Sequence, residues 1–264
     1  MDRSTSDALR HKVMNLYQIQ MASLDQNSQL ITQLLPETST QNRFITQILV
    51  ENKHLLSRLQ QINATKKVGV MDFADPISIG SRLLKTDSQA QLLCRNSFLY
   101  PELCKYRRNF YYRNKLDPKK GFYSEALIYV EHVKFLRDAK QDKILSQARY
   151  ADVAAISPPN IQQITKLSGK RPDQKQLQLS MQTKILQTLR AFKQAQATVL
   201  ILGAFGCGAS GNDPKLVAQS FCSCLKRAEF KGVFEQVYFD IWQDPATLVE
   251  FQRAFAAYKR LWHK

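Results

Sequence analysis

The stretch that decides the fold is Ala197-Thr-Val-Leu-Ile-Leu-Gly-Ala-Phe-Gly-Cys-Gly-Ala-Ser-Gly-Asn-Asp213. It begins with a mostly apolar run that is typical of a buried strand. A loop with four glycines follows, and Asn212 and Asp213 then cap a helix that is predicted over 214–228. A strand, a glycine loop and a helix in this order direct backbone N–H groups and a helix N-terminus toward an anion, for which phosphate is the natural candidate. Glycines that serve only close packing are the alternative interpretation.

The stretch is not a P-loop, because the Gly-Lys-Ser/Thr ending is absent. Gly206-Cys-Gly-Ala-Ser-Gly211 has the Gly-x-Gly-x-x-Gly spacing of a dinucleotide-binding loop, which by itself is a weak signal. Strand patterns elsewhere alternate with helical ones, which predicts an α/β sheet with a ligand crevice at the carboxyl ends of its strands. The predicted strands are 67–74, 126–130, 133–136, 150–156, 197–202 and 234–241, and the predicted helical segments are 88–115, 161–195, 214–228 and 245–258.

The N-terminal quarter of the chain has a different character. Apolar residues recur at helical spacing from Val13 to Leu59, with many Gln, Asn, Ser and Thr between them. Pro36 interrupts this stretch, so at least two helical pieces are expected. We therefore expect a helical extension over residues 1–60, packed on a core domain over residues 61–264.

Composition limits the classes of partner. The 264 residues include 38 Lys and Arg against 22 Asp and Glu, for a formal net charge of +16. This balance favours nucleic acid, an anionic membrane surface or a phosphate-bearing ligand, with a merely solvated basic surface as the alternative. Small basic clusters occur at Lys105–Arg108 and Lys119–Lys120, but no nucleic-acid-binding signature accompanies them. Nucleic acid is therefore not the expected partner, although a basic nucleic-acid-binding protein remains a third interpretation.

No metal, cofactor or membrane span is expected. The five cysteines are odd in number and irregularly spaced, which indicates reduced thiols, and the four histidines form no ligand motif. No apolar run is long enough to cross a bilayer, and the N-terminus lacks the apolar core of a signal peptide. We expect a monomer in the cytoplasm.

Several stretches together resemble the bacterial-type poly(ADP-ribose) glycohydrolases, which have a macrodomain fold. The glycine loop at 202–214 resembles their phosphate loop, and Val68–Asp75 resembles their strand that ends in Asn-Phe-Ala. Leu93–Pro101 resembles their Leu-Cys-Arg-x-Ser-x-Leu-Tyr helix, and Gly121–Ser124 and Ser157–Asn160 follow their central section. The resemblance covers roughly residues 45–245 and implies a macrodomain-like mixed sheet flanked by helices, with ADP-ribose as the ligand.

The chain departs from this family where the family carries its catalytic acid. The family has a Gly-Gly-Gly loop followed by Gln-Glu-Glu, whereas this chain has Pro76–Ser81 and then Gln89-Ala90-Gln91. A glutamine cannot donate a proton as a carboxylic acid does. Three aspartates lie in the altered region: Asp72, which stands where the family has Asn, Asp75 and Asp87.

Two interpretations of the lost glutamates stay open. In the first, the protein is an ADP-ribosylhydrolase that removes mono-ADP-ribose from a protein side chain, with arginine as the expected one. Atypical effector-type macrodomain hydrolases are similar in this respect, and this similarity implies a second possible location, injection into a host cell as a bacterial effector. The catalytic candidates in this interpretation are Asp75, Asp72 and Asp87, which activate water or contact the ribose. In the second, it is an inactive ADP-ribose reader. Both interpretations share the same predicted ADP-ribose contacts: Ile79, Gly80, Gln89, Gly203, Phe205, Gly206, Cys207, Gly208, Ala209, Ser210, Gly211 and Asn212.

Overall fold

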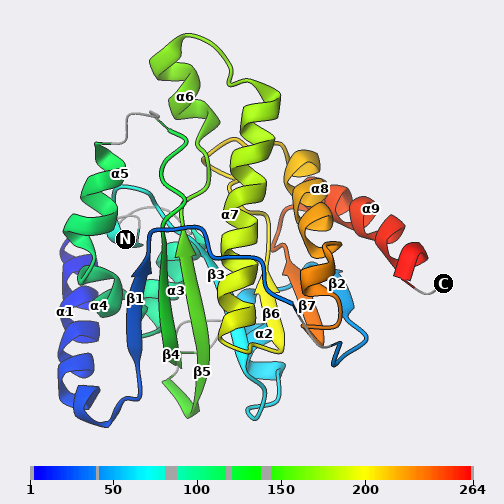
Figure 1. Ribbon diagram of the computed structural model, residues 1–264. Coiled ribbons are helices and arrows are strands. Elements are labelled where there is room, and N and C mark those ends of the chain that lie inside the picture. Colours follow the sequence, from blue (N-terminus) through cyan, green and yellow to red (C-terminus); the bar gives the residue numbers. More distant parts are fainter. Residues whose placement is uncertain (1–2, 40–41, 81–87, 117–120, 138–143, 263–264) are drawn as a thin grey trace.

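The computed structural model describes residues 3–39, 42–80, 88–116, 121–137 and 144–262, which form a mixed seven-stranded sheet (Figure 1). The strand order is β1-β4-β5-β3-β6-β7-β2. From β5 to β2 neighbouring strands run parallel, whereas β4 is antiparallel to both β1 and β5. The fold prediction of a mixed α/β sheet is thus confirmed. The strands are β1 (Asn27–Ile31), β2 (Gln47–Glu51), β3 (Val68–Phe73), β4 (Leu127–Arg137), β5 (Ile144–Ile156), β6 (Val199–Leu202) and β7 (Gln236–Asp240).

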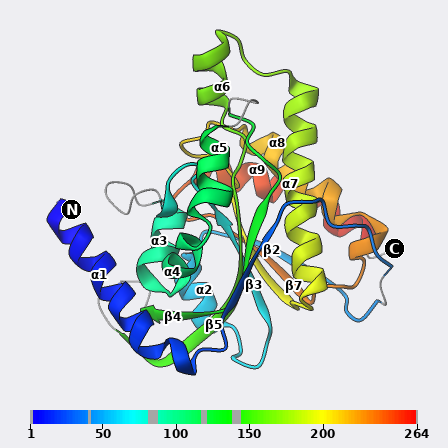
Figure 2. The same ribbon diagram turned by 60° about the vertical axis from the view of Figure 1, so that its left-hand side comes forward.

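Helices cover both faces of the sheet (Figures 1 and 2). Apolar side chains of the last three helices form one core with the sheet: α7 (Gln174–Gln194), α8 (Pro214–Leu225) and α9 (Pro245–Trp262). A second core lies on the other face under α2 (Leu55–Gln61), α3 (Gln89–Asn96), α4 (Leu99–Cys104) and the π-helix η3 (Arg107–Tyr112). The remaining helices are α1 (Arg3–Gln20), α5 (Arg113–Lys115), α6 (Ile161–Ser168) and the short 3-10 turns η1 (Met21–Ser23) and η4 (Ala228–Phe230).

The central strands are buried because both of their faces meet helices. Every residue of β6 is buried, and so is β3 as far as Asp72, which explains their continuous apolar character in the sequence. The five parallel strands end at one edge of the sheet, toward α6 in Figure 1. Loops that follow parallel strands meet at this edge, where open α/β sheets bind their ligands.

The expectation of an entirely helical N-terminal stretch is wrong. Helices α1 and α2 form, but β1 and β2 between them are strands at the two edges of the sheet. Gln47 of β2 pairs in parallel register with Gln236 of β7, far away along the chain. This long-range pairing overrides the helical spacing of the apolar residues. The division into domains at residue 60 stays a prediction, although the sheet includes strands from both sides of it.

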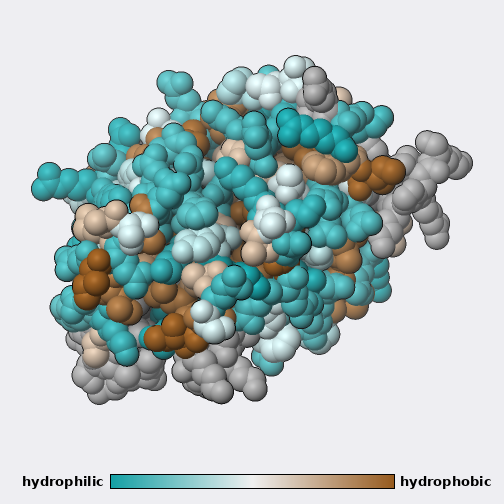
Figure 3. Space-filling model, turned by 90° about the horizontal axis from the view of Figure 1, so that it is seen from below, coloured by the Kyte–Doolittle hydropathy of each residue, from teal (hydrophilic) through white to brown (hydrophobic). Residues whose placement is uncertain are grey.

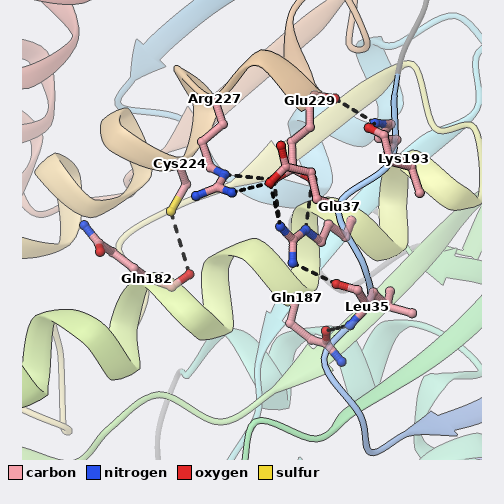
Figure 4. A network of polar contacts seen from close by, with 10 residues as sticks. Leu35, Glu37, Gln182, Gln187, Lys193, Cys224, Arg227 and Glu229 are labelled. Atoms are coloured by element: carbon pink, nitrogen blue, oxygen red, sulfur yellow. Dashed lines mark hydrogen bonds and ion pairs between the residues drawn. The ribbon is translucent and has the colours of Figure 1, made fainter.

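The connection between β1 and β2 crosses from one edge of the sheet to the other and is held by a polar clamp (Figure 4). The Arg190 guanidinium donates to both carboxylate oxygens of Glu229 at 2.9 Å and to the Leu35 carbonyl at 2.7 Å. Arg227 donates to Glu229 at 2.8 Å and also pairs with Glu37. The clamp therefore joins the crossing segment to α7 and to the end of α8.

The surface at the amino-terminal edge of the parallel strands is mostly hydrophilic, with apolar residues in small separate groups (Figure 3). Among the residues that the structure describes, no helix combines the length and the apolar character needed to cross a bilayer.

Candidate functional site

A cleft of about 840 Å³ opens at the carboxyl edge of the sheet. It lies where β2, β3, β6 and β7 end, and the first residues of α2 and α3 form part of its wall. Its lining contains two cations, a tryptophan and two of the residues expected from the sequence, Gln89 and Gly208. The lining side chains used below are those of Lys53, His54, Phe73, Gln89, Arg95, Gly208, Asp240 and Trp242.

The glycine loop after β6 is fixed by Asn212. The Asn212 side-chain amide donates to the carbonyls of Pro159 at 2.8 Å and Gly206 at 3.0 Å, so it ties the loop to the segment before α6. Gly206 has a φ of 74°, and a Cβ there would lie 2.6 Å from the Pro158 Cβ atom. Only glycine fits this backbone conformation without strain.

Part of the loop backbone retains hydrogen-bonding capacity. The N–H groups of Gly206, Gly208, Ala209 and Ser210 donate no hydrogen bond to another residue of the described chain. Because Gly208 lies on the wall of the cleft, these groups are suited to an anion such as phosphate. The following helix is capped as expected, since the Asp213 carboxylate accepts from the Lys215 N–H at 3.0 Å.

Asp72 is the most unusual carboxyl group near the cleft, although it is not one of the residues that line it. Its side chain is fully buried near the end of β3, and neither carboxylate oxygen has a hydrogen-bond partner among the described residues. Burial, with a smaller contribution from the charge of Asp75, raises its pKa to about 7. Burial and the charge of Asp72 also raise the pKa of Cys94 and Tyr111 well above their ordinary values. Asp72 is therefore a carboxyl group that can change its protonation state near neutral pH.

Asp75 and Gln89 also lie near the end of β3. Unlike Asp72, both side chains accept hydrogen bonds from backbone N–H groups. One Asp75 carboxylate oxygen accepts from the N–H groups of Ile77 at 2.9 Å and Ser78 at 2.8 Å, which closes a turn. The Gln89 side-chain carbonyl accepts from the Phe73 N–H at 3.0 Å, which joins the start of α3 to the strand end. The structure thus brings Asp72, Asp75 and Gln89 into one neighbourhood.

The other residues expected at the site have varied surroundings. Phe205 is fully buried, and its ring centroid lies 5.5 Å from that of Phe73. Ile79 packs against the core under α3, and Gly80 is buried. Burial raises the pKa of the Cys207 thiol to about 12. Asp87 lies outside the described residues.

The sequence did not reveal the wall of the cleft formed by Trp242 and its neighbours. Trp242 is 51% exposed, and the His54 ring meets it edge-on with the centroids 5.7 Å apart. Arg58 donates three hydrogen bonds of 2.9 to 3.2 Å to the Asp240 carboxylate, and its guanidinium carbon lies 3.9 Å from the centroid of the Tyr238 ring. Asp240 and Trp242 lie at the end of the predicted strand 234–241, so the rule that ligands bind at the carboxyl ends of strands could have indicated this wall.

This chain is similar to known proteins in both sequence and structure. The sequence profile named "Microbial-type PARG, catalytic domain" matches residues 5–138, just over half of the chain. No curated protein matches the chain.

Solved structures match over nearly the whole length. Poly(ADP-ribose) glycohydrolase from Thermomonospora curvata, bound to the inhibitor ADP-HPD, is 22% identical with a TM-score of 0.80, over 96% of this chain and 100% of that one. The enzyme from Deinococcus radiodurans in complex with ADP-ribose is 22% identical with a TM-score of 0.74, over 98% and 93%. At this level of identity the match establishes a shared fold.

Proposed function

We propose that this chain, which belongs to the family of microbial-type PARG catalytic domains, binds ADP-ribose in the cleft and hydrolyses an ADP-ribosyl linkage. The structurally similar glycohydrolases hold ADP-ribose or the inhibitor ADP-HPD. Support within this chain comes from the glycine loop and from the ionisable group at the neighbouring strand end.

The cleft offers a complementary group for each part of ADP-ribose. The open N–H groups of the glycine loop bind the diphosphate, and Lys53 and Arg95 add positive charge beside it. The exposed indole of Trp242 gives the adenine a flat apolar surface. Gln89, the first residue of α3, lies beside the end of β3, and in this proposal it contacts a hydroxyl of the distal ribose.

The observation that carries the catalytic proposal is the buried carboxyl group of Asp72, which has no hydrogen-bond partner within the described part of the chain. With a pKa of about 7, it is partly ionised at neutral pH, so it can accept a proton from an attacking water. The water oxygen bonds to the anomeric carbon as the bond to the leaving group breaks, and the water proton passes to Asp72. Asp75 assists by keeping that pKa high through its negative charge.

A linkage to arginine fits this arrangement best. The Gln89-Ala90-Gln91 segment supplies no carboxylic acid to protonate a leaving oxygen. A guanidine leaves as a strong base that takes up its own proton from the solvent, so it depends less on such an acid. We therefore propose mono-ADP-ribosylated arginine in a protein as the substrate.

One observation favours an ADP-ribose reader as a second candidate. The Asp72 side chain has no exposed surface, so a water must enter the core around it before it can react. In a reader, Asp72 remains protonated and contributes only a ribose contact, while the cleft binds ADP-ribose without chemistry.

A release assay separates the two functions. The protein is incubated with arginine-, serine- and glutamate-linked mono-ADP-ribosylated peptides, and free ADP-ribose is measured by mass spectrometry. Release from the arginine-linked peptide supports the proposal. Binding of ADP-ribose by calorimetry without release from any peptide supports the reader, and absence of binding contradicts both candidates.

A further inference from the structure

The outer side of η3 and α5 is a continuous basic surface. We define the basic ridge as Arg107, Arg108, Tyr112, Arg113 and Lys115, all of which are exposed. These residues occupy successive turns of η3 and α5. Its one aromatic side chain, Tyr112, is 55% exposed.

The cations of the basic ridge are not neutralised by the described part of the chain. No ion pair among the described residues includes Arg107, Arg108, Arg113 or Lys115. The nearest acid preceding them in the sequence, Glu102, is fully buried, where it pairs with Lys105 and accepts from the hydroxyls of Tyr17 and Ser28. The ridge therefore presents four positive charges to solvent.

The inner side of the same segment fixes the basic ridge in place. Phe110 and Tyr111 are buried in the core under α3 and α4, and their rings pack edge to face at 5.0 Å. A helix that binds a membrane surface inserts its apolar face into the lipid. Here the apolar face is already buried in the protein, so a lipid surface fits poorly.

We infer that the basic ridge binds single-stranded nucleic acid, although the sequence alone carries no nucleic-acid-binding signature and did not make nucleic acid the expected partner. Its guanidinium and ammonium groups are placed along the segment to contact successive phosphates, and Tyr112 offers an aromatic face on which an unpaired base can stack. This inference goes beyond the proposed hydrolysis and does not depend on it. It also explains part of the net charge of +16, which exceeds what one diphosphate ligand requires.

The test is fluorescence anisotropy with a labelled oligothymidylate at low salt and over a salt series. For Arg107→Glu combined with Arg108→Glu, we expect a Kd at least roughly tenfold higher. The slope of log Kd against log salt concentration should fall by about 1.4. Tyr112→Ala should raise the Kd by about fivefold or more, because it removes the stacking surface. Circular dichroism and the Tm establish that each variant is folded.

The control is Arg43→Glu combined with Arg253→Glu, which changes the net charge equally at exposed positions elsewhere. We expect the control to bind nearly as well as the unmodified protein. Equal weakening in both double variants would mean that net charge alone governs binding and would overturn the inference. So would absence of binding at low salt, or binding to anionic vesicles that depends on the ridge while the oligonucleotide does not bind.

Discussion

Asp72 and Glu229 are both buried carboxyl groups, but their surroundings are opposite. Glu229 is held by Arg190 and Arg227 through three hydrogen bonds of 2.8 to 2.9 Å, and these contacts lower its pKa despite the opposing effect of burial. Asp72 has no hydrogen-bond partner among the described residues, and burial raises its pKa to about 7. The first group stabilises a connection of the chain, whereas the second costs stability and remains available for chemistry.

The difference gives the two groups opposite effects on stability as the pH changes. Glu229 has a lowered pKa in the folded state, so its contribution is present above its unfolded pKa and is lost as the pH falls through its folded value. Asp72 has a raised pKa, so its contribution is most favourable below its unfolded pKa and is lost as the pH rises to about 7.

The largest expected effect comes from breaking the clamp. Glu229→Gln leaves the buried guanidinium of Arg190 with only the exposed carboxylate of Glu37, 3.6 Å away, as countercharge, so we expect the free energy of unfolding to fall by roughly 3 kcal/mol. Urea denaturation at neutral pH measures the change. Glu250→Gln, which removes an exposed pair with Arg253, is the matched control and should cost less than about 0.5 kcal/mol. A loss in Glu229→Gln no larger than in this control would contradict the role given to the clamp.

Asp72→Asn should instead increase the free energy of unfolding. The amide keeps the shape of the side chain but cannot ionise, so near pH 8 we expect a gain in unfolding free energy on the order of 2 kcal/mol. The gain should shrink toward zero near pH 4, where the carboxyl group is protonated in the folded state. Denaturation of both proteins at several pH values measures this difference. A gain that does not vary with pH would mean that Asp72 does not titrate as described.

A smaller effect is expected within the glycine loop. Gly206 lies in close contact with other residues, whereas Gly208 faces open space. Gly206→Ala puts a Cβ 2.5 Å from the Asn212 side-chain nitrogen at a φ of 74°, so we expect a loss of roughly 1–2 kcal/mol. A Cβ at Gly208 meets nothing within 4 Å, so Gly208→Ala should change stability by less than about 0.5 kcal/mol. Thermal unfolding measures both, and equal losses would contradict the assignment of the loop conformation.

The parts of the fold that follow from local chemistry could be predicted from the sequence. The apolar run of β6, the glycine loop and the Asp213 cap are local patterns, and they appear where expected. Strands β1 and β2 were missed because each is five residues long and is specified by a distant partner rather than by its own pattern. The clamp could not be predicted for the same reason, because Glu37 and Arg190 lie far apart in the sequence.

The site could be predicted in part for similar reasons. The resemblance directed attention to Asp72, but the burial that raises its pKa depends on how α3 and η3 pack against β3. Trp242 was missed because a single tryptophan after a strand carries no pattern of its own, and only the convergence of four strand ends makes it part of the cleft.

The central claim is that Asp72 acts as the ionisable group in hydrolysis of ADP-ribosyl-arginine, and a pH–rate profile tests it most directly. We predict that kcat/KM for the unmodified protein rises with pH with an apparent pKa near 7, because the ionised carboxylate accepts the water proton. Asp72→Asn should lose at least roughly a hundredfold in kcat/KM while it still binds ADP-ribose in calorimetry. An Asp72→Asn variant as active as the unmodified protein, with the same pH profile, would contradict the claim.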